Sequence, residues 1–245
     1  MRKTTRIVLI CCVALALVSC AGSDGEEAER AGAGPTPARD AAGESTAVFS
    51  GRPAREWIEQ LLESDEPKER LEAASALAKM GPEVSGSTDA LIVALGDQSS
   101  LVRTAATAAL QRFGRDTLAK LYPAVRGNQN PRVRAGSAVA ISQIGAADPR
   151  TMPALIAALE DPSGLVRRIV TQVISIFGAR AGEAVPALIK TLGDEDVEVR
   201  VAAATTLGII GPAAEAAGPA LRRVLQDSDE NVRGAARTAL RNIER

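Results

Sequence analysis

The sequence predicts an all-α protein, an α-solenoid of about six stacked helix pairs. The main observation is a Val-Arg pair that recurs at five regularly spaced positions, with its arginines 31, 33, 33 and 33 residues apart, at Arg103, Arg134, Arg167, Arg200 and Arg233. A glycine follows each of the first four arginines after eleven residues, and Arg70 with Gly81 adds an earlier unit. A fixed period near 33 residues is typical of repeat proteins whose units bury their apolar faces against their neighbours.

The second helix of each unit is predicted from its ends and its apolar spacing. Residues that favour a helix start lie four positions before most of the arginines, in the column Glu66, Ser99, Asn130, Ser163, Asp196 and Asp229. Pro67 and Pro131 follow at the first helical position, where a missing N–H costs nothing. Apolar residues then recur at helical spacing until the glycine, which predicts a helix of about fourteen residues.

The first helix of each unit is predicted from a Pro-Ala-Leu triplet that recurs at Pro153, Pro186 and Pro219. Pro123 lies three residues later in its own unit, so we expect it to kink or shorten that helix. Alanines on the buried side of the second helices should let neighbouring backbones approach closely: Ala106, Ala140, Ala203 and Ala236.

These signals divide the chain into three parts: residues 1–19 as a signal peptide, 20–48 as a tether and 49–245 as the solenoid. The six predicted units are residues 52–83, 84–116, 117–147, 148–181, 182–214 and 215–245. The tether has almost no large apolar residues and therefore has nothing to bury. Glu69 in place of valine, and the charged residues around it, favour a polar capping unit at the start of the array. Trp57 is expected to seal that end.

The first twenty residues resemble a bacterial lipoprotein signal. Arg2, Lys3 and Arg6 precede a twelve-residue apolar stretch, which ends in Leu-Val-Ser-Cys at Cys20. The resemblance implies cleavage before Cys20 and attachment of lipid to its thiol. Two or more acyl chains would hold the protein on a membrane. There are two alternatives. One is an ordinary signal peptide that contains a cysteine by chance, and the other is a membrane anchor that is retained.

That resemblance implies a lipid-anchored location in a bacterial cell envelope. Because Ala21 and not aspartate follows the cysteine, we expect the outer membrane, facing the periplasm or the cell surface.

The composition removes most catalytic chemistry. The chain has no histidine and three cysteines, which lie at positions 11, 12 and 20. Ser-His triads, Cys-His nucleophiles and His/Cys metal sites therefore lack their parts. We expect a protein that is not an enzyme, with no catalytic, cofactor-binding or metal-binding residues. Residues 49–245 carry 24 acids and 24 basic groups, and aromatic residues are scarce, which disfavours nucleic acid as a partner.

The run from Leu192-Gly-Asp194 through Val199-Arg200 to Gly211 resembles the short HEAT repeat of the bilin-lyase type, over roughly residues 52–245. Ankyrin repeats share the period but need a Thr-Pro-Leu-His signature, and tetratricopeptide repeats need more aromatic residues. Di-iron hydroxylases built from HEAT repeats rely on His-Glu pairs, which this chain cannot form.

The same resemblance implies an ion-pair ladder between neighbouring units, formed by each arginine and the aspartate six residues before it. The matching positions are Asp97 and Arg103, Asp161 and Arg167, Asp194 and Arg200, and Asp227 and Arg233. Asn128 and Ser64 replace the aspartate before Arg134 and Arg70, so we expect those two junctions to be weaker. The ladder is interpreted as structural.

In HEAT stacks the second helices usually line the concave side, where a protein segment can bind. Counting from each arginine as zero, we expect positions 3, 6, 7 and 10 in the core and positions 1, 4, 5, 8 and 9 outside. These thirty outward positions contain five basic residues and no acid. The predicted partner-binding residues are Lys79, Arg112, Arg168, Gln172, Arg237 and Arg241. An equally weighted interpretation is that these positions carry small residues only because a tightly curved inner surface tolerates nothing larger.

The function expected from these patterns is that of a membrane-tethered envelope lipoprotein, a monomer whose solenoid is a non-catalytic scaffold for unknown protein partners. One alternative is a bilin-lyase-like or other tetrapyrrole-handling enzyme subunit. Another is a purely structural component of the envelope.

Overall fold

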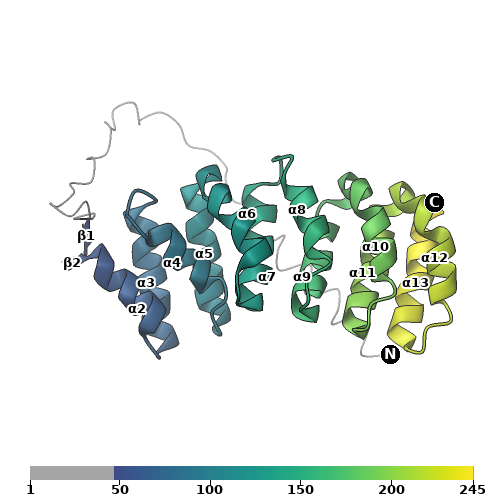
Figure 1. Ribbon diagram of the computed structural model, residues 1–245, viewed down its shortest axis with the longest axis horizontal. Helices are drawn as coiled ribbons and strands as arrows, with labels where there is room; N and C mark the ends of the chain where they lie inside the picture. Colours follow the sequence, from purple (N-terminus) through teal and green to yellow (C-terminus); the bar gives the residue numbers. More distant parts are fainter. Residues whose placement is uncertain (1–46, 245) are drawn as a thin grey trace, which may run out of the picture. The chain divides into compact units, whose positions relative to one another are not determined.

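The computed structural model describes residues 47–244, and these form helix pairs that follow one another in chain order (Figure 1). We call the first helix of each pair the A helix and the second the B helix. The A helices are α2 (Ala54–Glu63), α4 (Ser87–Ala94), α6 (Leu118–Gly127), α8 (Thr151–Ala158), α10 (Val185–Thr191) and α12 (Gly218–Val224). The B helices are α3 (Pro67–Met80), α5 (Ser100–Phe113), α7 (Pro131–Ile144), α9 (Gly164–Ser175), α11 (Val197–Ile210) and α13 (Glu230–Ile243). The predicted all-α solenoid of six pairs is confirmed.

The B helices begin where the sequence predicts, at the residue after each proposed cap. In three of them the cap side chain accepts a hydrogen bond from a backbone N–H of the first turn: Asn130, Asp196 and Asp229. Ser99 and Ser163 stand at the same position without such a bond. The asparagine and aspartate caps therefore satisfy orphan donors, whereas the two serines and Glu66 mark only the change of backbone direction.

Glycine is required at the ends of the B helices for different physical reasons. Gly114 and Gly211 have φ angles of 79° and 71°, a conformation that glycine adopts without strain. Gly145 has φ −105°, but a Cβ there would lie 2.7 Å from Thr151 Oγ1. At Gly145 the requirement is therefore lack of space. Helix α9 ends earlier, and Gly178 opens the 3-10 helix η2 (Gly178–Ala184) that leads to the next pair.

The prediction that Pro123 shortens its helix is wrong. Helix α6 has ten residues and contains Pro123 in its interior, whereas Pro153, Pro186 and Pro219 stand in the first turns of α8, α10 and α12. The short 3-10 helix η1 (Arg115–Thr117) leads directly into α6. A second 3-10 helix, η3 (Gly211–Ala217), joins α11 to α12.

A small β-ribbon, which the sequence analysis missed, precedes the first helix. Strands β1 (Val48–Phe49) and β2 (Arg52–Pro53) pair antiparallel, with Val48 opposite Pro53. The Trp57 indole is 3% exposed and donates from Nε1 to the Phe49 carbonyl at 3.2 Å. The Arg52 guanidinium lies 4.1 Å from the Trp57 ring centre, which gives a cation–π contact. The ribbon and Trp57 together cover the first helix pair.

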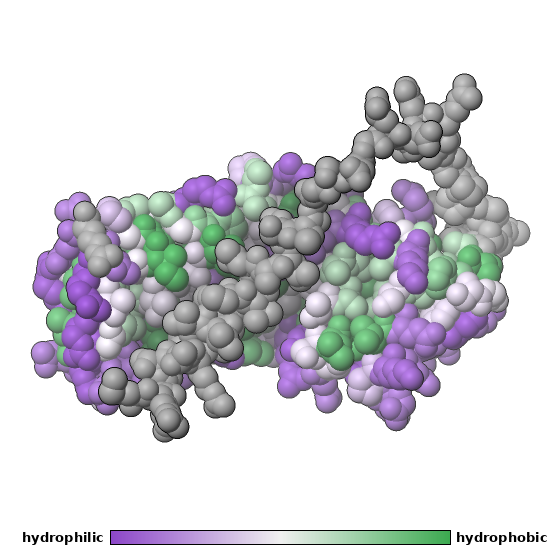
Figure 2. All heavy atoms as spheres, turned by 180° about the vertical axis from the view of Figure 1, so that it is seen from behind, coloured by the Kyte–Doolittle hydropathy of each residue, from purple (hydrophilic) through white to green (hydrophobic). Residues whose placement is uncertain are grey.

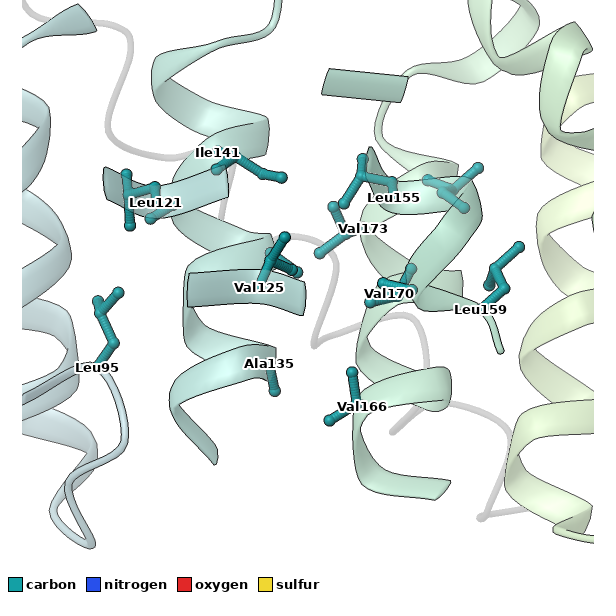
Figure 3. Close-up of a cluster of buried hydrophobic side chains, with 14 of the residues drawn as sticks. Leu95, Leu121, Val125, Ala135, Ile141, Leu155, Leu159, Val166, Val170 and Val173 are labelled. Carbon is teal, nitrogen blue, oxygen red and sulfur yellow. The ribbon is translucent and has the colours of Figure 1, made fainter. Parts of the chain in front are cut away.

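The core is one continuous apolar cluster that runs from Trp57 to Ile243. The predicted core positions of the B helices are buried almost throughout, including Leu77, Leu110 and Leu207 at 0% exposure. In Figure 3, side chains of α6, α7, α8 and α9 point toward one another across the pair boundaries, among them Leu121, Ile141 and Val173. Each pair is therefore completed by its neighbours, as a repeat architecture requires.

One part of the inside–outside assignment is wrong. The side chains four residues after the arginine were expected outside, but four of them are 0% exposed: Ala74, Ala138, Thr171 and Ala204. Ala135, Ser142 and Gly208 are also buried. These residues lie where successive B helices pack against each other, and a Cβ at Gly208 would approach Ala239 Cα to 2.8 Å. The exposed strip of the B helices is therefore narrower than the periodicity suggests.

Residues 197–224 form a helical segment that is long and apolar enough to cross a membrane by composition alone. It consists of α11, η3 and α12, with a kink at Ala214, and 56% of its most apolar window is buried. Its apolar character is therefore that of two core helices from successive repeats.

Candidate functional site

The ladder between neighbouring units is present as four arginine–aspartate pairs. The guanidinium Nε and Nη2 of each arginine donate to the two carboxylate oxygens of the aspartate 27 residues later, over distances of 2.6–3.1 Å. The pairs are Arg70–Asp97, Arg134–Asp161, Arg167–Asp194 and Arg200–Asp227. Two parallel charge-assisted bonds of this kind fix both the distance and the angle between units.

Each ladder arginine also binds the loop before its own helix. The third nitrogen, Nη1, donates to the carbonyls six and five residues earlier, as Arg134 does to Asn128 at 2.7 Å and Gln129 at 3.2 Å. The predicted ion pair between each arginine and the aspartate six residues before it is therefore wrong: that aspartate offers its backbone carbonyl, and its carboxylate binds the arginine of the preceding unit. Within a unit the arginine binds the backbone, and between units it binds the carboxylate.

The aspartate of each pair, which we call the rung aspartate, is also held by a hydrogen bond within its own turn. Asp161 Oδ1 accepts from the Ser163 backbone N–H at 2.8 Å, and Asp97, Asp194 and Asp227 make the same turn. Burial by itself raises the pKa of Asp161, but the bonds from Arg134 and Ser163 outweigh it and leave the pKa below its ordinary value. Conversely, the hydrogen bond to Asp161 raises the pKa of Arg134.

The ladder has one interior gap, at Arg103. Its Nη1 binds the carbonyls of Asp97 and Gln98, but no carboxylate among residues 47–244 binds its other nitrogens. The rung position of the next unit is Asn128, whose Oδ1 accepts from Asn130 N at 2.9 Å as the aspartates do. Because Asn128 stands where the other units have the rung aspartate, Arg103 of the preceding unit lacks a carboxylate partner among residues 47–244. Arg134 itself binds Asp161 and is fully paired.

The expectation for Ser64 is wrong for a related reason. A rung aspartate binds the arginine of the preceding unit, and no B helix precedes α3 within residues 47–244. Arg70 itself binds Asp97, and Ser64 Oγ instead donates to Glu69 at 2.6 Å.

Three of the predicted partner-binding residues, Lys79, Arg112 and Gln172, lie on the exposed strip of the B helices. We call this strip the B face and define it by positions 5 and 9 of each unit: Ser75, Lys79, Ala108, Arg112, Val139, Gln143, Gln172, Ile176, Thr205, Ile209, Thr238 and Asn242. None of these twelve residues is buried, and none is an acid. Arg168, Arg237 and Arg241 border the strip, with Arg168 half-buried and the other two exposed.

The chemistry of the B face changes along the array. Lys79 and Arg112 lie toward the first units, and Ile176 and Ile209 follow with exposed fractions of 67% and 46%. Gln111 donates to the side chain of Gln143 at 2.8 Å and links α5 to α7 across it. The space-filling view likewise shows apolar patches among hydrophilic groups on one side of the molecule (Figure 2).

Among residues 47–244 there is no group of three or more acids, histidines or cysteines placed to hold a metal ion. The tight Arg150–Asp148 pair lowers the pKa of that carboxyl, mainly through the hydrogen bond from Arg150, but Arg150 is exposed. Cys20, the predicted lipid attachment residue, lies outside the described residues.

Sequence reasoning missed two residues that lie beside the gap in the ladder, Arg132 and Ile169. The spacing of 31 residues between Arg103 and Arg134, against 33 elsewhere, is the feature that could have drawn attention to them.

Comparisons with known proteins agree with the repeat architecture. Residues 54–142, 88–175 and 152–241 match HEAT repeats. No curated protein sequence matches the chain. A solved complex of CpcE and CpcF of phycocyanin lyase from Nostoc sp. PCC7120 is 22% identical, with a TM-score of 0.53, and the match covers 63% of this chain and 98% of that one.

Two further solved structures share the fold. Kap121p is 18% identical with a TM-score of 0.57, and the match covers 78% of this chain and 25% of that one. YibA of Escherichia coli is 22% identical with a TM-score of 0.53, and the match covers 76% and 69% of the two chains. At such identities the likeness concerns the fold. Together with the repeats matched over residues 54–241, it shows that this chain belongs to the HEAT-repeat family.

Proposed function

We propose that this protein is a membrane-tethered scaffold that binds protein partners on its B face and carries out no catalysis. The observation that carries the proposal is the composition of that face. Twelve exposed or half-exposed positions on six helices include basic, amide and apolar side chains and no acid. Residues 49–245 as a whole carry as many acids as basic groups, so the absence is local to this strip.

A face of this kind suits an extended protein segment. Exposed Ile176 and Ile209 supply apolar contact area, and Gln143 and Gln172 supply hydrogen-bonding groups beside them. Arg112, Arg237 and Arg241 give the strip a positive charge that favours acidic partners. Rigid repeat arrays provide such surfaces without ordering any of their own backbone on binding.

The membrane tether in this proposal rests on the residues before the array. The apolar stretch and the Leu-Val-Ser-Cys run at Cys20 support lipid attachment, and the polar segment 21–48 would connect the anchor to the array. We place the protein in a bacterial cell envelope, at the outer membrane, on this basis.

A second candidate function is the handling of a tetrapyrrole, as an enzyme subunit. It is favoured by the likeness in fold to the phycocyanin lyase complex. Purified protein that shifts the absorption spectrum of added bilin or haem at equimolar concentration would support this alternative. An unchanged spectrum would count against it.

Site-specific photo-crosslinking in the native cell tests the scaffold. A photoreactive residue is placed at Gln172 or Thr205 on the B face, and, as matched controls, at Ala119 or Ala157, which are exposed on α6 and α8. We expect the first two positions to crosslink to a common partner and the controls to give no such product. Crosslinks only from the A helices, or none from either set, would contradict the proposal.

A further inference from the structure

The junction between α5 and α7 differs from the other junctions between B helices. These two helices pack over less of their length than any other successive pair, and α7 also contacts the end of α4. A Cβ at Gly136 would lie 2.6 Å from the Leu95 carbonyl oxygen, and one at Gly96 would lie 2.5 Å from Val133 Cγ2. Two glycines therefore permit a close approach of α7 to α4 at this junction.

Arg103 lies at this junction and has an unused binding edge. Its Nη1 bonds of 2.8 Å and 2.9 Å to the carbonyls of Asp97 and Gln98 hold the guanidinium, as in the five other ladder arginines. In four of those arginines, Nε and Nη2 bind a carboxylate. In Arg103 this edge has no carboxylate partner among residues 47–244. The planar pair of donors is thus preorganised for a carboxylate that residues 47–244 do not supply.

A groove of about 480 Å³ adjoins Arg103 between α5, α7 and α9. Arg132 and Arg168 also line it, and neither side chain pairs with an acid within the described part of the chain. Val139, Leu165 and Ile169 supply apolar surface, and no lining residue is acidic. In Figure 3, Ala135 of α7 and Val166 of α9 point into the space between these helices, which shows how α7 and α9 meet beside the groove.

We propose that this groove binds an aspartate or glutamate side chain of a protein partner, with the acid on Arg103 and its apolar neighbours on Val139, Leu165 and Ile169. The partner thereby supplies the rung that Asn128 omits. The inference rests on the proposed scaffold function and adds the chemistry of what the scaffold recognises. An acidic segment with apolar flanks matches both the charge and the walls of the groove, whereas a lipid headgroup would match only the charge.

Peptide binding to the full-length purified protein tests this. The probe is a fluorescent nine-residue peptide with one central aspartate between leucines, and its counterpart has asparagine in place of the aspartate. We expect the aspartate peptide to bind about tenfold more tightly, since a bidentate charged contact is lost in the counterpart. Equal affinities, or no binding of either peptide, would overturn the proposal.

Matched variants separate recognition from folding. Arg103→Gln should weaken the aspartate peptide about tenfold, while Arg233→Gln removes the same bonds to backbone carbonyls far from the groove and should leave the affinity unchanged. Arg168→Gln should weaken binding, and Arg237→Gln on α13 should not. Equal losses in Arg103→Gln and Arg233→Gln would show an indirect structural effect and would overturn the proposal.

Two further outcomes distinguish this inference from the scaffold function. If the peptides fail to bind but the B face still crosslinks to a native partner, acid recognition is wrong and the scaffold stands. If the aspartate peptide binds but no native partner contacts the B face, the scaffold function is wrong. Binding of anionic phosphatidylglycerol vesicles that depends equally on Arg103 would assign the groove to lipid and overturn the protein partner.

Discussion

Arg134 and Asp161 bind each other through two parallel hydrogen bonds, Nε to Oδ2 at 2.6 Å and Nη2 to Oδ1 at 2.8 Å, although 27 residues separate them. Their side chains are only 10% and 6% exposed. The pair is a rung between the third and fourth units, and the same geometry recurs at three other junctions. Charged groups so placed are stable only as a pair, because either one alone would be desolvated without compensation.

Asp161→Asn should therefore destabilise the array. Asn128 makes the same turn in its own unit, so the substitution keeps the loop and removes only the charge. We expect the free energy of unfolding to fall by about 2 kcal/mol, as measured by urea denaturation at pH 7. As a control, Asp89→Asn breaks the exposed ion pair with Lys120 and should cost less than about 1 kcal/mol. Similar losses in the two variants would contradict a special role for the ladder.

The ladder also predicts acid sensitivity. The pKa of Asp227 is lowered mainly by its hydrogen bond from Arg200, and those of Asp97, Asp161 and Asp194 are lowered because their bonds outweigh the effect of burial. A depressed folded-state pKa gives stability that is fully present above the unfolded value of about 4 and is lost as pH falls below it.

The urea midpoint should accordingly change little between pH 7 and 5 on account of these groups, and should fall between pH 4 and 2. Asp161→Asn should show a smaller fall over that range, because it has one fewer group to titrate. An identical pH dependence in the wild-type protein and in Asp161→Asn would contradict this explanation.

Restoring the missing rung should stabilise the junction at Arg103. In Asn128→Asp, the turn to Asn130 is kept and a carboxylate is added at the rung position, so we expect about 1 kcal/mol of added stability. Gln129→Asp adds the same charge at the neighbouring exposed residue and serves as the control. Equal midpoints in the two variants would show that Asn128 is not the cause of the gap.

Close packing between the last two B helices predicts opposite effects for two glycines. Gly208→Ala would place a Cβ 2.8 Å from the Ala239 backbone and should cost about 1–3 kcal/mol. Gly234→Ala lies on α13 with open space around it, so the better helix propensity of alanine should add about 0.5 kcal/mol or more. Thermal unfolding followed by circular dichroism distinguishes the two, and a loss at Gly234 equal to that at Gly208 would contradict the packing argument.

The proposed lipid anchor makes a prediction that is independent of the fold. Cys20→Ala should abolish incorporation of labelled palmitate and leave unprocessed precursor, because the thiol that accepts the lipid is gone. Cys12→Ala lies within the predicted signal peptide and is the matched control, with labelling expected to persist. Labelling that survives in Cys20→Ala would exclude this residue as the anchor.

The sequence by itself determined the helix pairs, their order and their ends. A period of 33 residues, the caps at Asn130, Asp196 and Asp229 and the apolar spacing of the B helices depend only on local chemistry, so they could be read without coordinates. The small β-ribbon escaped prediction because two-residue strands leave no periodic pattern.

Only the tertiary structure decided which arginine each rung aspartate binds and how narrow the B face is. Both depend on the distance between successive B helices, which packing sets and a one-dimensional pattern does not contain. For this reason Ala138 is buried although its helical position suggested exposure, and Asn128 leaves Arg103, a residue of the preceding unit, without a carboxylate. The groove at Arg103 lies where α5 and α7 pack over less of their length, and this could be found only in three dimensions.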